Sequence, residues 1–71
     1  MKFLVVVEKG MDGWGAHVPD LPGCIAAGKT RQEVLRLIRE AVAFHIEGMH
    51  EAGESVPNPS SEGEVIDVDA A

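Results

Sequence analysis

The segment TRQEVLRLIREAVAFHIEGMHEAG, residues 30–53, is the one stretch of this chain long and regular enough to cover a sheet. Thr30 can accept a hydrogen bond from the first-turn N–H groups, and Glu33 can reach back to the Thr30 N–H, which is the capping-box pattern. Gly53 and Pro57 favour a stop just beyond the segment. At about 100° per residue, the apolar side chains share one arc: Val34, Leu35, Leu37, Ile38, Ala41, Val42, Phe44, Ile46 and Met49. The segment therefore predicts one long amphipathic helix with a buried apolar face and a solvent-exposed polar face.

Three short segments before this helix predict an antiparallel sheet. Residues 2–8, rich in β-branched side chains, and residues 14–18, with alternating apolar positions, flank turn residues at 10–13. Residues 24–27 follow a stiff turn that holds two prolines and a glycine. Residues 64–68 are expected to form a last strand. The predicted fold class is α+β: a three-stranded antiparallel sheet, one long helix and a fourth strand, in the order β-β-β-α-β.

The length of the chain points to association. Seventy-one residues allow one domain, residues 1–71, in which residues 60–71 are either an acidic tail or the last strand. Cys24 is the only cysteine, so no disulfide within the chain can stabilise this small core. The first strand is apolar on both faces, yet one helix covers only one of them. The other face must meet a second copy, a partner or the folded-back C-terminal segment, and we expect a homo-oligomer, either a dimer or a tetramer.

Charge is concentrated in the last third of the sequence. The net charge is −6, and all of it arises after His50, where six acids and no base occur. Such a surface repels phosphate and favours a basic partner, so a nucleic-acid-binding role is not indicated. The single thiol and the lack of a long apolar run predict a cytoplasmic protein without a membrane segment.

The histidines and the cysteine do not form a convincing catalytic or metal site. His45 lies near the middle of the apolar arc and is expected to be a buried, hydrogen-bonded core residue. His50 has too few neighbouring ligands for a metal. His17 beside Asp20 could act as a general base, but no nucleophile shares its hairpin, and an interface or surface role is favoured. Cys24 is expected to be a small buried residue. We predict no catalytic residue, no cofactor and no metal.

Several motifs resemble the HicB family of antitoxins. They are WGAHVPDLPGC at residues 14–24, GKTRQEV at 28–34, EA at 40–41 with HIEGM at 45–49, and GESVPNP at 53–59. The resemblance implies a partial RNase H-like fold whose fourth strand lies beside the first and parallel to it. It also implies a partner, because HicB antitoxins bind and mask HicA toxins, which are small basic ribonucleases that cleave messenger RNA. Many HicB proteins carry a C-terminal DNA-binding segment, whereas here only twelve residues follow Pro59, four of them acidic and none basic, so we expect no direct DNA binding.

The resemblance also bears on activity and on contact positions. RNase H-like enzymes hold metal ions with carboxylates that include one on the first strand, and Leu4-Val5-Val6 supplies none, so we expect no enzyme. The expected role is occlusion of a HicA-like toxin. The alternative is a stand-alone homo-oligomer that binds another protein or a small ligand. The predicted partner-binding residues lie around the rigid turn and in the acidic tail: Trp14, His17, Asp20, Leu21, Glu62, Glu64, Asp67 and Asp69.

Overall fold

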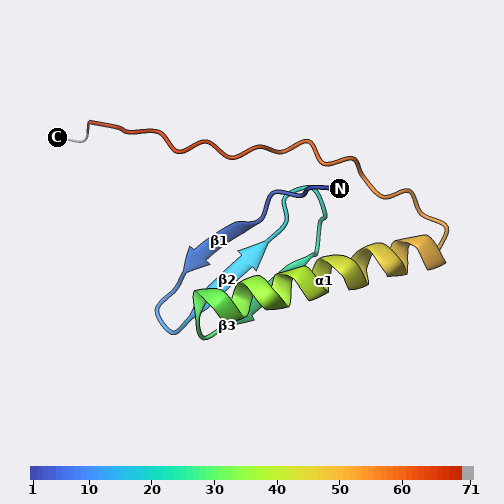
Figure 1. Ribbon diagram of the computed structural model, residues 1–71, viewed down its shortest axis with the longest axis horizontal. Helices are drawn as coiled ribbons and strands as arrows, with labels where there is room; N and C mark the ends of the chain where they lie inside the picture. Colours follow the sequence, from blue (N-terminus) through green and yellow to red (C-terminus); the bar gives the residue numbers. More distant parts are fainter. Residues whose placement is uncertain (70–71) are drawn as a thin grey trace.

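A computed structural model of the chain describes residues 1–69 and orders their elements as β1 (Val6–Lys9), β2 (Trp14–His17), β3 (Ile25–Gly28) and α1 (Arg31–Glu51). The strands form one antiparallel sheet in the order β1-β2-β3, and α1 packs along one side of it (Figure 1). The predicted α+β class, with three antiparallel strands followed by one long helix, is therefore confirmed. No helix within the described range combines the length and the apolar character needed to cross a membrane.

The β1–β2 hairpin depends on close backbone approach. The turn is closed by the Gly10 N–H, which donates to the Gly13 carbonyl at 2.7 Å. A Cβ atom on Gly13 would lie 2.6 Å from the carbonyl oxygen of Gly28, at the far end of β3, so only glycine fits there without a backbone shift. The register that follows pairs Val7 with Ala16, and Ala16 with Ala26, on the side that faces α1. Small side chains in this row let the helix lie close to the sheet.

Helix α1 begins as its cap predicts. Thr30 is the N-cap, and its Oγ1 accepts a hydrogen bond from the Glu33 N–H at 3.0 Å. The Glu33 carboxylate reaches back to the Lys29 N–H at 3.1 Å, one residue earlier than the predicted Thr30 partner. At the other end Gly53 has φ of 72°, and the Glu54 N–H donates to the Met49 carbonyl at 2.9 Å. Terminal backbone groups at both ends of the helix thus find hydrogen-bond partners within a few residues.

The core lies between the sheet and the first half of α1. Its buried members come from β2, the following turn and the helix: Ala16, Val18, Leu21, Cys24, Val34 and Ile38. A 21-residue helix is ~31 Å long, whereas a strand of four residues spans only ~13 Å, so the second half of α1 extends past the sheet. For this reason Phe44, predicted on the packed arc, is 79% exposed. His45 is half-buried, which corrects the expectation of a buried core histidine.

The first strand is shorter than predicted. Pairing with β2 starts only at Val6, because β2 ends at His17 and offers no partner to earlier residues. Phe3 and Val5 instead pack against the helix side of the core, together with Val42. Residues 2–5 therefore form an extended segment beside α1, which we call the N-terminal segment.

The predicted fourth strand is not formed within the described residues. Residues 54–69 leave the end of α1, turn back past the N-terminal segment and continue as an extended chain away from β1 (Figure 1). A strand needs a neighbour about 4.8 Å away, and residues 64–68 have none, so Val65, Ile66 and Val68 are exposed. Residues 70 and 71 of the predicted tail lie outside the described residues.

Candidate protein-interaction surface

The sheet face turned away from α1 carries side chains that the core does not use. Strand register places two adjacent rows on it: Val6, His17 and Ile25, then Glu8, Gly15 and Ala27. We call these six residues the open face. All of them are half-exposed or exposed, whereas the alternate residues of the same strands pack towards α1. The helix covers one side of the sheet, and the open face remains accessible.

The shape of the open face suits a side chain from another protein. Ile25 is 70% exposed, and beside it Gly15 and Ala27 leave a shallow depression of about 600 Å³ over β2 and β3. An exposed aliphatic next to a floor of small residues can take a protruding apolar side chain, which is how central contacts of protein interfaces are built. The depression is too open to enclose a small ligand.

One histidine and one carboxylate lie close together on the open face. The Nδ1 atom of His17 is 3.9 Å from Oε1 of Glu8, and the two side chains are 45% and 73% exposed. Such an exposed pair adds little to stability and gains an ionic component only when the histidine is protonated. His17 therefore presents its ring on the surface, as the sequence predicted.

Asp20 holds the tail to the turn between β2 and β3. Its Oδ2 atom accepts hydrogen bonds from the N–H groups of Ser60 and Ser61, both at 2.9 Å. Its Oδ1 atom accepts from the Ser61 hydroxyl at 2.8 Å and from the Ser60 hydroxyl at 3.3 Å. These donors, the Ser61 N–H first, hold the pKa of Asp20 below its ordinary value. The structure thus gives this predicted contact residue a role within its own chain, which we call the Asp20 clamp.

Two other predicted contact residues point towards the core. Leu21 is 1% exposed and belongs to the buried cluster, so its side chain does not offer a surface to a partner. Trp14, at the start of β2, is half-buried and packs against the same cluster, on the side opposite His17. The structure therefore does not bring Trp14, His17 and Leu21 together on one surface.

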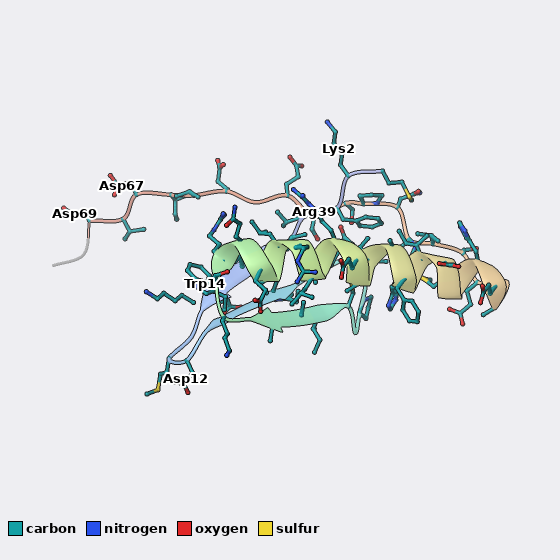
Figure 2. All side chains as sticks on the ribbon, turned by 60° about the horizontal axis from the view of Figure 1, so that its bottom comes forward. Lys2, Asp12, Trp14, Arg39, Asp67 and Asp69 are labelled. Carbon is teal, nitrogen blue, oxygen red and sulfur yellow. The ribbon has the colours of Figure 1, made fainter. Side chains whose placement is uncertain are left out.

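The predicted tail acids are exposed and stand apart from the open face. They lie along the extended chain that follows the Asp20 clamp: Glu62, Glu64, Asp67 and Asp69. Figure 2 shows Asp67 and Asp69 at the far end of this chain, well away from the middle of α1. They form an acidic arm beside the folded body.

The described residues hold no group of three His, Cys, Asp or Glu side chains that could ligate a metal ion. Cys24 is buried, and burial raises the pKa of its thiol. His50 is exposed near the end of α1. Within residues 1–69, the features that geometry assembles are an open sheet face and an acidic arm, both of which are suited to contact with macromolecules.

Comparisons with known proteins place these features in a family. The family model for the HicB_like antitoxin of bacterial toxin-antitoxin systems matches residues 3–70. A UPF0150 protein of Thermoplasma acidophilum is 40% identical over 63 residues, which cover 87% of this chain and 91% of that protein. An uncharacterised 14.9 kDa protein of Haemophilus phage HP1 is 46% identical over 57 residues, or 80% of this chain and 43% of that protein.

Two further matches carry names that bear on function. Antitoxin HicB 2 of Photorhabdus laumondii is 31% identical over 66 residues, which cover 93% of this chain and 48% of that protein. A chain from a solved HicA3 and HicB3 toxin-antitoxin complex has a TM-score of 0.68 and 29% identity, over 83% of this chain and 72% of that chain. This chain therefore spans less than half the length of the phage relative and of HicB 2.

Proposed function

Because the chain belongs to the HicB-like family of antitoxins from bacterial toxin-antitoxin systems, we propose that it neutralises a HicA-type, mRNA-cleaving toxin by covering it. The proposed role needs no chemistry from this chain, only a surface that holds the toxin away from its RNA. The observation that supports it best is the open face, an accessible and partly apolar side of a sheet whose other side α1 already covers.

The proposed contact centres on Ile25. In protein interfaces a few central apolar or aromatic anchors carry most of the binding free energy, and the surrounding residues mainly exclude water. Ile25 is the large exposed aliphatic of the open face, with Gly15 and Ala27 beside it as a floor. His17 and Glu8 would lie beside this centre and supply polar contacts. Trp14 and Leu21 would act indirectly, by supporting the strands from the core side.

The acidic arm supports the same partner through its charge. HicA toxins are expected to be basic, because they bind RNA. Glu62, Glu64, Asp67 and Asp69 are four of the six acids that give the last third of the chain its net negative charge. A negative field of this kind speeds encounter with a basic protein and weakens as salt is added. The Asp20 clamp fixes where the arm starts relative to the folded body.

A matched pair of variants tests the proposal. Ile25→Asp places a charge at the proposed centre of the contact, and Phe44→Asp places the same charge on a similarly exposed apolar residue of α1. Each variant is co-expressed with a HicA-type toxin, and growth rescue and co-purification are scored. We expect Ile25→Asp to weaken binding by at least about tenfold, the loss typical of a truncated interface anchor, and to lose rescue. Phe44→Asp should behave as the wild type.

Two results would contradict the proposal. If Ile25→Asp and Phe44→Asp rescued equally well, the open face would not be the toxin site. If the wild-type chain neither rescued growth nor co-purified with any HicA-type toxin while remaining folded, the stand-alone alternative would replace the antitoxin role.

A further inference from the structure

A second surface lies between the N-terminal segment and α1. Its floor is apolar, formed by Phe3 and Val5 on one side and by Ile38 and Val42 on the other, and its volume is about 370 Å³. Lys2 and Arg39 also line it, and no acidic residue does. We call this feature the basic groove. Among residues 1–69, neither Lys2 nor Arg39 takes part in an ion pair.

The end of the tail has the complementary chemistry. Residues 65–69 read Val-Ile-Asp-Val-Asp, so aliphatic side chains are interspersed with carboxylates. Val65, Ile66 and Val68 are 99%, 71% and 67% exposed. Three large aliphatics in contact with water on one short extended segment are unusual unless another surface covers them. Apolar side chains with carboxylates between them fit an apolar floor lined by two cations.

The tail does not reach the basic groove of its own chain. The Asp20 clamp fixes it at Ser60 and Ser61, and at Gly63 it passes the side chain of Leu4. Beyond this point it runs away from the body (Figure 1). Lys2 and Arg39 lie near the middle of α1, whereas Asp67 and Asp69 lie at the distant end of the tail (Figure 2). Within one chain, residues 65–69 are thus too far from the basic groove to bind in it, although their chemistry is complementary.

We propose that the tail end of one copy, residues 65–69, docks in the basic groove of a second copy. Each copy has one groove and one tail. If two copies are related by a two-fold axis, the tail of each fills the groove of the other, and the assembly closes as a dimer. Asp67 and Asp69 of one copy would face Lys2 and Arg39 of the other, while the aliphatic side chains cover Phe3, Val5 and Val42.

The charge of the groove favours a second copy over the toxin as its occupant. A basic ribonuclease would bring further positive charge to Lys2 and Arg39, which costs binding free energy, whereas this chain's own tail is acidic. The open face is on the other side of the sheet from α1, so the groove and the proposed toxin surface do not overlap. Substitutions of Lys2 and Arg39 therefore test the docking separately from the antitoxin role, whereas Asp67 and Asp69 also belong to the acidic arm.

A charge-swap experiment on the full chain tests the proposal. The molecular mass is measured by light scattering and sedimentation over a range of concentrations. Lys2→Glu/Arg39→Glu makes the groove acidic, and Asp67→Lys/Asp69→Lys makes the tail basic. Each double variant alone should be monomeric where the wild type is a dimer, with self-association weakened at least about tenfold. An equimolar mixture of the two should form a heterodimer, because it restores opposite charge at both contacts.

Controls separate docking from folding and from toxin binding. Arg36→Glu changes the charge of an exposed residue of α1 outside the groove and should leave the dimer intact. Circular dichroism verifies that each variant is folded. Co-purification with the toxin should be retained by Lys2→Glu/Arg39→Glu, because both residues lie outside the open face and the acidic arm. A wild type that stays monomeric at high concentration, double variants that still dimerise, or a mixture that fails to associate would each overturn the proposed exchange.

Discussion

Replacing Leu21 by alanine distinguishes a core role from a contact role for this residue. Leu21 is 1% exposed and packs in the cluster that contains Val34 and Ile38. The change removes three carbon atoms, which at about 0.8 kcal/mol each lowers the free energy of unfolding by ~2.4 kcal/mol before any cavity is counted. The cavity raises the expected loss to about 2.7–5 kcal/mol. A chain of 71 residues has a total stability of only ~4–11 kcal/mol, so the loss is a large fraction of the whole.

The assay is urea and thermal unfolding followed by circular dichroism, with Ile66→Ala as the matched control. This control also removes three carbon atoms, but from a side chain that is 71% exposed. We expect the melting temperature to fall by more than about 10 °C for Leu21→Ala, at roughly 4–8 °C per kcal/mol. For Ile66→Ala, measured at protein concentrations below those at which the proposed dimer forms, the change in the free energy of unfolding should be within about 0.5 kcal/mol.

Toxin binding supplies the second half of this test. Well below its melting temperature, Leu21→Ala should bind the toxin nearly as the wild type does, because the folded variant presents the same open face. The reasoning would be refuted if Leu21→Ala unfolded like Ile66→Ala, or if it kept full stability and lost toxin binding.

Four further predictions follow from local geometry. Thr30→Ala removes the oxygen that accepts the N-cap hydrogen bond and should lower the free energy of unfolding by about 1 kcal/mol, measured by urea unfolding. Gly13→Ala should lower it by about 1–3 kcal/mol, because the new Cβ meets the Gly28 carbonyl at 2.6 Å. Gly48→Ala, in α1 with open space around it, should raise it by about 0.5–1 kcal/mol in the same assay. The pKa of Asp20 is lowered in the folded state, so the stability it contributes is complete above its ordinary value of 3.8 and is lost as the pH falls through the lower folded value. Unfolding midpoints measured from about pH 6 to about pH 2 should therefore decline less for Asp20→Asn than for the wild type; equal slopes would contradict the Asp20 clamp.

Local signals predicted the helix and its ends well. Thr30 with Glu33 at one end and Gly53 at the other act within a few residues of themselves, so their effect can be deduced from spacing alone. The same holds for the β1–β2 hairpin, where turn residues and alternation determine the register. The placement of His17 on the face away from the core also followed from alternation.

Features that depend on the whole molecule were not accessible from sequence. Phe44 fits the apolar arc by periodicity, but the sheet ends before reaching it, and strand length is set by pairing. The Asp20 clamp joins residues 40 and 41 positions apart, and no local pattern marks Ser60 and Ser61 as its donors. The predicted fourth strand failed for a related reason. Its sequence favours a strand, but residues 64–69 run beside no other strand in the described part of the chain, although the outer edge of β1 is unpaired there.

The most direct test of the central claim is to map the toxin on the chain by NMR. The ¹⁵N-labelled protein is titrated with an unlabelled HicA-type toxin, and backbone amide shifts are followed residue by residue. We expect the largest changes on the open face, at Gly15, His17, Ile25 and Ala27, while amides on the exposed side of α1 around Arg36 and Phe44 stay unchanged. Largest changes along α1, with the open face unaffected, would contradict this claim.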